Sequence, residues 1–259
     1  MADAALQMAE PVVGMRSLRV LARLLDYPTQ ELQAAAGELI EIIDQERRLP
    51  AALRTALMDW CQRIADADLL ELQSEYVARF DKGRATSLLL FEHVHGESRD
   101  RGQAMVDLMA EYNAAGFELD ARELPDYLPI FLEYLSTREE AEIARWLGEI
   151  RHIRGLLTAR FEERGADHGL VTRALLALIG AESEADAHRE EVQAEAPDDT
   201  PEALDAVWEE EAVRFSAESD QDCALQSAEG RRLAERKQGV QSEAVRILSP
   251  EAMPPVTGR

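Results

Sequence analysis

Residues 17–28 read Ser-Leu-Arg-Val-Leu-Ala-Arg-Leu-Leu-Asp-Tyr-Pro and set the pattern for the first half of the chain. Apolar residues recur there every three or four positions, which places their side chains on one face of an α-helix. The Tyr27-Pro28 step ends the pattern, because the residue before a proline avoids helical backbone. The stretch therefore predicts an amphipathic helix whose core-facing stripe is Leu18, Leu21, Leu24 and Leu25.

The same period continues along the chain. Thr29 is placed to cap a second helix that ends before Pro50, and Gly116 is placed to close a later one. No alternating strand pattern and no internal repeat is found. The fold is predicted to be all-α, with further helices in the ranges 29–49, 51–64, 69–80, 99–115, 124–135, 139–164 and 168–179, and with a segment at 86–92 that leads into a histidine-rich turn.

Composition supports a helical core built from aliphatic side chains. Of the 259 residues 46% are hydrophobic but only 5% are aromatic, and the most abundant types are strong helix formers. We expect a flexible N-terminus over residues 1–15 and one helical-bundle domain over residues 16–181, which is large enough to bury a core without disulfides or metals.

The character of the chain changes after Gly180. Between Glu182 and Val213 there are 13 acidic residues and one basic residue. Such a segment buries too little apolar surface to offset its ordering entropy. Residues 182–259 are therefore predicted to form a long acidic, largely disordered tail, with a short ordered or inducible element near residues 203–215, where Leu204, Val207, Trp208 and Val213 cluster.

The net charge of −23 limits the kinds of partner. It argues against nucleic acid and against docking on an anionic membrane, and it favours a basic peptide or a basic protein patch. Cys61 and Cys223 lie far apart and show no metal-ligand spacing. Neither a secretory signal nor a membrane-spanning run is present, so we expect a cytoplasmic protein without stable membrane association.

Residues 88–102, Leu-Leu-Leu-Phe-Glu-His-Val-His-Gly-Glu-Ser-Arg-Asp-Arg-Gly, hold an unusual density of polar groups. His93 and His95 would point roughly 200° apart on a helix and could share a metal only on an extended turn. Ser87 and Ser98 lack the glycine-framed elbow of a nucleophile. We therefore predict no metal site and no catalytic residues, although a helical metal-dependent hydrolase using the two histidines and a plain helical adaptor stay open as alternatives.

A second polar group occurs near residues 124–133. Asp126 is placed to cap a helix start, and Glu133 stands between apolar residues, as expected at the edge of a groove. Arg99 and Arg101 are solvated charges or partners of these two carboxylates. Tyr76 and Phe80 are expected to be apolar anchors that end a helix.

Three motifs carry a family resemblance. They are Tyr76-x-x-x-Phe80-Asp81, then His93-Val94-His95-Gly96-x-Ser98-Arg99-x-Arg101-Gly102, then Leu124-Pro125-Asp126-Tyr127-Leu128-Pro129-x-Phe131-Leu132-Glu133. In order and spacing the chain resembles the NarJ family of nitrate reductase assembly chaperones, within the wider TorD-like group. The similarity covers about Leu18 to Phe215 and extends to the acidic stretch Trp208–Phe215.

The resemblance implies a non-enzymatic helical chaperone of the TorD-like type. Its partner would be the N-terminal peptide of the apo nitrate reductase α subunit, alone or as the αβ complex. The chaperone would bind no cofactor stably, would assist insertion of molybdopterin guanine dinucleotide and iron–sulfur centres into the client before membrane docking, and would be absent from the mature enzyme. A chaperone of the same fold for another molybdoenzyme is the alternative.

A client-binding groove is predicted from these residues. Aromatic side chains would line the groove and carboxylates at its rim would meet positive charge on the client. The predicted binding residues are Tyr76, Phe80, Asp81, His93, His95, Arg99, Asp126, Tyr127, Phe131 and Glu133.

Overall fold

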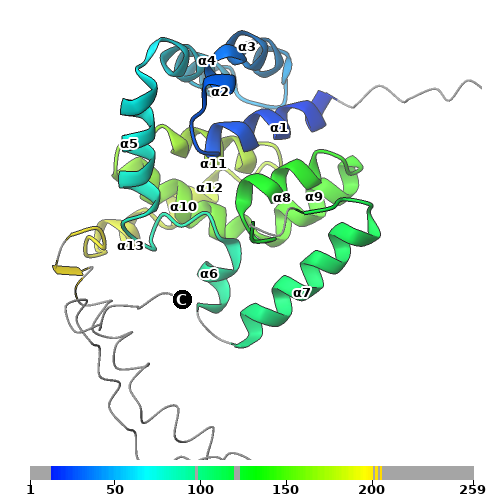
Figure 1. The fold of residues 1–259 in the computed structure, drawn as a ribbon, viewed down its shortest axis with the longest axis vertical. Helices are drawn as coiled ribbons and strands as arrows, with labels where there is room; N and C mark the ends of the chain where they lie inside the picture. The colour runs from blue at the N-terminus through cyan, green and yellow to red at the C-terminus, as the bar shows by residue number, and fades with distance from the viewer. Residues whose placement is uncertain (1–12, 97–98, 120–122, 201, 204, 206–259) are drawn as a thin grey trace, which may run out of the picture. The chain divides into compact units, whose positions relative to one another are not determined.

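The structure is a computed structural model that describes residues 13–96, 99–119, 123–200, 202, 203 and 205. The described residues form helices and no strand, which confirms the all-α prediction (Figure 1). The helices are α1 Val13–Leu25, α2 Gln30–Ala34, α3 Ala36–Gln45, α4 Ala51–Asp66, α5 Leu69–Phe80, α6 Leu90–His95, α7 Arg99–Ala114, α8 Leu128–Leu135, α9 Glu140–Glu149, α10 Arg151–Glu163, α11 His168–Ala177, α12 Ser183–Ala187 and α13 Arg189–Gln193.

Helix α1 is the central element of the core. Its four predicted leucines are all buried, with at most 2% of each residue exposed. The helix packs against α3, α8 and α11 (Figure 1). Burying one such leucine contributes about 1.5–3 kcal/mol before the entropy cost of folding, so the stripe holds α1 in the core.

The predicted boundaries of the first helices are confirmed. Helix α1 ends two residues before the Tyr27-Pro28 step, and the Thr29 hydroxyl accepts a hydrogen bond from the Leu32 amide at 3.2 Å. One predicted helix is divided in two, however, because a short turn at Ala35 separates α2 from α3.

The predicted helix 139–164 is also divided, at Ile150, whose backbone leaves the helical region. A buried arginine explains the break. Arg154 donates to the Leu147 carbonyl in the last turn of α9 and to the Leu175 carbonyl at 2.7 Å. Carbonyls at helix ends lack partners within their own helix, so this guanidinium satisfies two buried acceptors and ties α9, α10 and α11 together.

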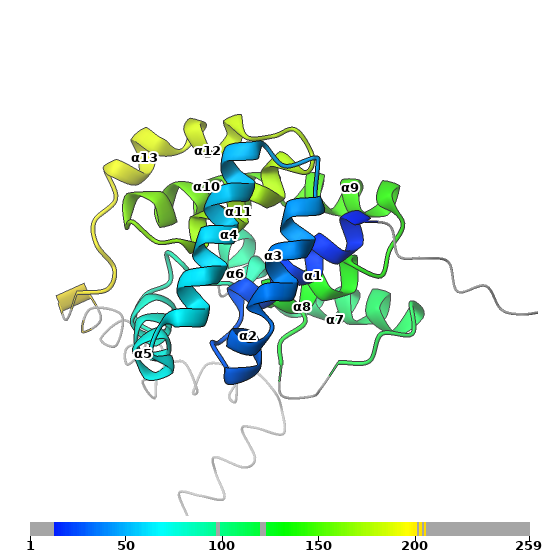
Figure 2. The same cartoon turned by 90° about the horizontal axis from the view of Figure 1, so that it is seen from above.

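The predicted end of the helical domain at residue 181 is too early, because residues 183–193 form two further helices. Helices α12 and α13 lie along α10 (Figure 2), and Ala185 and Val192 are buried. At Gly155 the α12 backbone approaches so closely that a β-carbon would lie 3.0 Å from the Glu184 carbonyl oxygen. The acidic composition indicated disorder, but this segment packs on α10 and is held there by arginines of that helix.

Residues 183–198 are named the acidic strap below. Glu195 forms an ion pair with Arg160 at 2.6 Å, and Asp198 forms one with Arg164, also at 2.6 Å. Asp198 also accepts from the Ala85 amide at 2.7 Å. Burial by itself raises the pKa of Asp198, but these donors outweigh it and hold the pKa below its usual value. The strap therefore closes one face of the fold with matched charges.

Two further predictions concern residues that lie partly outside the described part of the chain. Helix α1 begins at Val13, inside the N-terminus predicted to be flexible, and residues 1–12 lie outside the described residues. The element predicted near residues 203–215 also lies outside them, apart from Ala203 and Asp205. By its contacts the chain divides into two units, residues 1–204 and 205–259.

Candidate functional site

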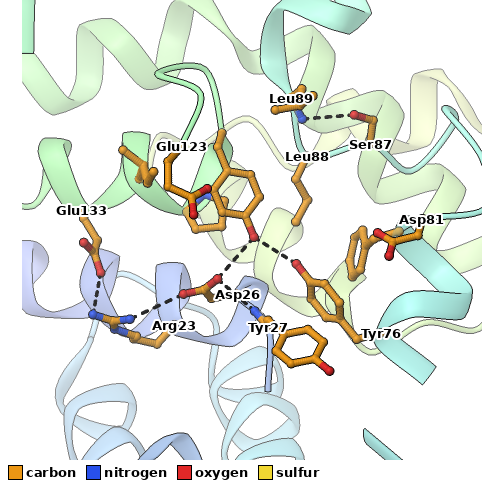
Figure 3. A pocket seen from close by; sticks show the side chains of 14 residues that line it. Arg23, Asp26, Tyr27, Tyr76, Asp81, Ser87, Leu88, Leu89, Glu123 and Glu133 are labelled. Carbon is orange, nitrogen blue, oxygen red and sulfur yellow. Dashed lines mark hydrogen bonds and ion pairs between the residues drawn. The ribbon is translucent and has the colours of Figure 1, made fainter. Parts of the chain in front are cut away.

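A groove with a volume of about 490 Å³ opens where the end of α1, the end of α5 and the start of α8 come together (Figure 3). We call it the tyrosine groove. It is lined by Arg23, Asp26, Tyr27, Tyr76, Phe80, Asp81, Ser87, Leu88, Leu89, Glu123, Tyr127, Pro129, Ile130 and Glu133.

A short backbone pairing brings two distant segments to the groove. Leu89 and Tyr127 form an isolated antiparallel bridge, in which the Leu128 amide donates to the Leu88 carbonyl at 2.8 Å and the Leu90 amide donates to the Asp126 carbonyl at 3.0 Å. Buried backbone groups require such partners. The pairing therefore fixes the position of Tyr127 relative to the segment that precedes α6.

Two tyrosine hydroxyls form a hydrogen-bonded network in the groove. The Tyr76 hydroxyl donates to the Leu25 carbonyl at 3.1 Å and lies 3.0 Å from the Tyr127 hydroxyl. The Tyr127 hydroxyl donates to Asp26 at 3.3 Å (Figure 3). Burial raises the pKa of Tyr76 to about 12 and also raises the pKa of Tyr127. Both phenols therefore stay neutral and present aromatic surface with satisfied polar ends.

Behind Tyr76 lies a cluster of rings that stiffens this wall. The Phe80 ring is 4.4 Å from the Tyr76 ring and 4.9 Å from the His168 ring, measured between centroids. Arg79 donates to His168 Nδ1 at 3.2 Å. Burial, reinforced by Arg79, lowers the pKa of His168 to about 3. His168 is consequently a neutral ring that packs among aromatic side chains.

The charge of the groove is predominantly negative. Among the lining residues that the structure describes, Asp26, Asp81, Glu123 and Glu133 are acidic and Arg23 is basic. Arg23 forms ion pairs with Glu133 at 3.0 Å and with Asp26 at 3.5 Å (Figure 3). An aromatic surface bordered by unmatched carboxylates is suited to a ligand that is both apolar and cationic.

Five of the ten predicted binding residues meet in the tyrosine groove: Tyr76, Phe80, Asp81, Tyr127 and Glu133. They come from α5 and from the segment around the start of α8, so the two motifs that were far apart in the sequence are neighbours in the fold. Their role in binding a client stays a prediction.

The prediction that Asp126 meets a client at the groove rim is wrong, because its side chain is fully buried. Asp126 Oδ2 accepts from the Phe91 amide at 3.1 Å and lies 3.9 Å from the Arg101 guanidinium. It thus caps the first turn of α6 and not the helix that follows it in sequence. The sequence left open whether Arg101 is a solvated charge or the partner of a carboxylate, and the structure shows the pairing with Asp126. Burial, partly offset by these two groups, raises the pKa of Asp126.

The prediction that Phe131 lines the groove is also wrong. Phe131 is 1% exposed, and its ring packs edge-on against Trp146, with 5.6 Å between centroids. Ile130 and Glu133, on the same helix, face the groove instead. Phe131 lies on a different face of that helix from Ile130 and Glu133, and the sequence alone did not show which face was turned inward.

The two histidines belong to helix α6 and not to the predicted turn, so they point to different sides. His93 Nε2 bonds the Ser87 carbonyl oxygen at 2.8 Å, and burial lowers the pKa of His93. The His95 ring meets the Phe91 ring edge-on, with 6.0 Å between centroids. Neither lines the tyrosine groove. Arg99 begins α7, and its side chain lies outside the described part of the chain.

Nine lining residues were not predicted from the sequence, and four of these are charged or aromatic: Arg23, Asp26, Tyr27 and Glu123. Two of them were identifiable in principle, because Asp26-Tyr27-Pro28 places an acid and an aromatic directly after a buried stripe, where a helix ends at the surface. Tyr27 is 43% exposed and its ring meets Tyr76 edge-on at 5.4 Å.

Comparison with known proteins places the chain in a family. The family described as nitrate reductase delta subunit matches residues 46–168. The nitrate reductase molybdenum cofactor assembly chaperone NarJ of Escherichia coli (strain K12) is 44% identical over 220 residues, which cover 85% of this chain and 93% of that protein.

Two further relatives have related names. The probable nitrate reductase molybdenum cofactor assembly chaperone NarW of the same strain is 43% identical over 209 residues, 81% of this chain and 87% of that protein. The probable NarJ of Bacillus subtilis (strain 168) is 28% identical over 163 residues, 61% of this chain and 85% of that protein. The chain belongs to the family of nitrate reductase molybdenum cofactor assembly chaperones.

Proposed function

We propose that this protein binds the N-terminal segment of the apo α subunit of respiratory nitrate reductase in the tyrosine groove. It holds that subunit, alone or with its β subunit, competent for insertion of the molybdenum cofactor and iron–sulfur centres before membrane docking. The observation that carries the proposal is the acidic, tyrosine-lined groove, in which four carboxylates face one arginine.

The groove matches the physical requirements for binding an amphipathic, partly basic peptide. Aromatic side chains in a desolvated hollow supply most of the affinity in peptide recognition, and charges at the rim set association rate and selectivity. Tyr76 and Tyr127 supply the aromatic surface, and Asp81 and Glu133 supply the charges at the rim. Screened rim charges also allow release, which a chaperone requires once the client matures.

The proposed role is one of holding and not of catalysis. The names of the relatives refer to molybdenum cofactor assembly, and we infer that molybdopterin guanine dinucleotide enters the client and is not a resident group of the chaperone. None of the described helices combines the length and apolar character needed to cross a bilayer. A chaperone of the same fold for another molybdoenzyme is the alternative, and the names of the relatives favour nitrate reductase.

Titration calorimetry tests this function directly. The full chain is titrated with the N-terminal peptide of the nitrate reductase α subunit from the same organism, at low and at high salt. We expect saturable one-to-one binding that weakens at high salt, because surface electrostatics are screened. Glu133→Gln should weaken binding about two- to fivefold, in proportion to the loss of one exposed charge contact.

Matched variants separate binding from folding. Glu149→Gln removes a carboxylate whose side chain is 52% exposed and pairs with Arg145 outside the groove, so peptide affinity should not change. Asp126→Asn should lower the melting temperature, because Asp126 is buried and caps α6. The absence of peptide binding to the wild-type chain at either salt would refute the proposed function.

A further inference from the structure

Arg23 occupies an unusual position in the tyrosine groove. It projects from α1 between two carboxylates, with Glu133 at 3.0 Å and Asp26 at 3.5 Å (Figure 3). These are two of the four acidic groups to which the proposed function assigns the recognition of a basic client. In the absence of a ligand, the Arg23 guanidinium thus occupies part of the site that the proposed function assigns to a basic side chain of the client.

Arg23 also borders a second hollow. This hollow has a volume of about 510 Å³ and is lined by Arg23, Asp26, Tyr27, Thr29, Glu31, Leu32, Ala35 and Leu39. It shares Arg23, Asp26 and Tyr27 with the tyrosine groove. The boundary between the two hollows is therefore made of these three side chains, and Glu31 is a carboxylate on the far side of it.

We infer that Arg23 is a specificity-determining residue that competes with the basic side chains of the client for Asp26 and Glu133. The inference rests on the proposed function. A lysine or arginine of the bound peptide takes the place of the guanidinium at these two carboxylates, and Arg23 turns toward the second hollow and Glu31. A peptide that brings apolar surface without positive charge leaves Arg23 in place and gains nothing from the rim.

The exposure of Arg23 makes such an exchange energetically accessible. Its side chain is 58% exposed, and that of Glu133 is 35% exposed. Ion pairs at this exposure are weak, since water screens them and two flexible side chains must be held in place. Arginine stems are long and flexible. The guanidinium can therefore leave both carboxylates without stranding a buried charge.

The inference predicts an effect of unusual sign. If Arg23 merely shaped the groove, its removal would weaken the binding of every peptide. If it competes with the client, its removal strengthens the binding of a basic peptide and leaves a neutral one nearly unaffected. The described lining residues then hold four carboxylates and no basic residue, so the salt dependence of binding should also become steeper.

The experiment combines three variants of the full chain with two peptides in titration calorimetry. The variants are Arg23→Gln, Arg23→Lys and Arg63→Gln, and the peptides are the α-subunit N-terminal peptide and a copy in which every lysine and arginine is glutamine. Arg63 serves as the matched control, because its side chain is 56% exposed and pairs with Asp167 away from the groove.

We expect Arg23→Gln to lower the Kd for the basic peptide about two- to tenfold, the range that corresponds to one or two exposed ion pairs. The Kd for the glutamine copy should stay within about twofold of the wild-type value. Arg23→Lys should bind the basic peptide much as wild type does, because it keeps the competing charge. Arg63→Gln should leave both affinities unchanged.

Two outcomes would overturn the inference while leaving the proposed function intact. Weaker binding of both peptides by Arg23→Gln would make Arg23 a structural or directly contacting residue. Unchanged binding of the basic peptide would show that no competition exists. Failure of the wild-type chain to bind the basic peptide refutes the proposed function itself, and the two failures are thus distinguished in one set of titrations.

Discussion

The tyrosine groove and the acidic strap are both places where acidic and basic side chains meet, but they meet in different proportions. At the strap each of two arginines forms an ion pair with one carboxylate: Arg160 pairs with Glu195 and Arg164 pairs with Asp198, both at 2.6 Å. In the described part of the groove lining, Arg23 stands as one basic residue against four carboxylates.

The difference separates structure from function. Charges matched one to one on partly buried arginines hold a segment against the fold, because removing one member would leave its partner unpaired. Unmatched charges in an open hollow repel one another in the free protein and are relieved by a cationic ligand. We therefore interpret the strap as part of the fold and the groove as the binding surface.

Truncation gives the largest expected effect. A chain ended after Ala181 lacks the strap, exposes the face of α10 that covers Ala185 and Val192, and leaves Arg160 and Arg164 without their carboxylates. Its free energy of unfolding should fall by roughly 3 kcal/mol or more. Denaturation in urea, followed by circular dichroism, measures the loss.

The control truncation keeps the strap. A chain ended after Phe215 should retain both wild-type stability and peptide binding, since it preserves the strap and its arginine partners. If the chain ended at Ala181 were as stable as the full chain, the strap would not be part of the fold and the contrast with the groove would be lost.

The dependence of stability on pH is the next largest effect, and it concerns the aromatic wall of the groove. The pKa of His168 is about 3 in the folded protein and about 6.5 in an unfolded chain. Between these values the unfolded chain binds the extra proton, so stability falls as pH falls below about 6.5. At about pH 5 the loss from His168 should be about 2 kcal/mol relative to neutral pH.

A substitution isolates this contribution. His168→Gln should lose less stability between pH 7 and pH 5 than wild type in urea titrations, because its side chain does not titrate. His93, whose pKa is also lowered by burial, leaves a smaller dependence of the same sign. His152→Gln at an exposed position is the matched control. An equal pH dependence in His168→Gln and wild type would contradict the neutral state of His168 in the folded protein.

Much of the fold could be predicted from the sequence because the helical period is a local signal. The stripe of α1 and the cap at Thr29 depend on neighbours within a few residues. The break at Ile150 could not be predicted, since it depends on Arg154 reaching a carbonyl of the preceding helix and one of α11. The strap was missed because its partners on α10 are distant in sequence.

The site was predicted in part for the same reason. Tyr76 and Tyr127 were identified from their motifs, but motifs do not show which way a side chain faces. Asp126 and Phe131 belong to the same stretch as Tyr127 and are buried. Arg23 was overlooked because its role depends on Glu133, which lies on a different helix and is far away in sequence.

Hydrogen–deuterium exchange of the full chain with and without the α-subunit peptide locates the bound peptide and so tests whether the tyrosine groove is the binding site. We predict slower exchange on binding at residues 23–27, 76–81 and 123–133, which border the tyrosine groove, and unchanged exchange over the strap at residues 183–198. Slower exchange confined to the strap and α6, with none at the groove, would contradict it.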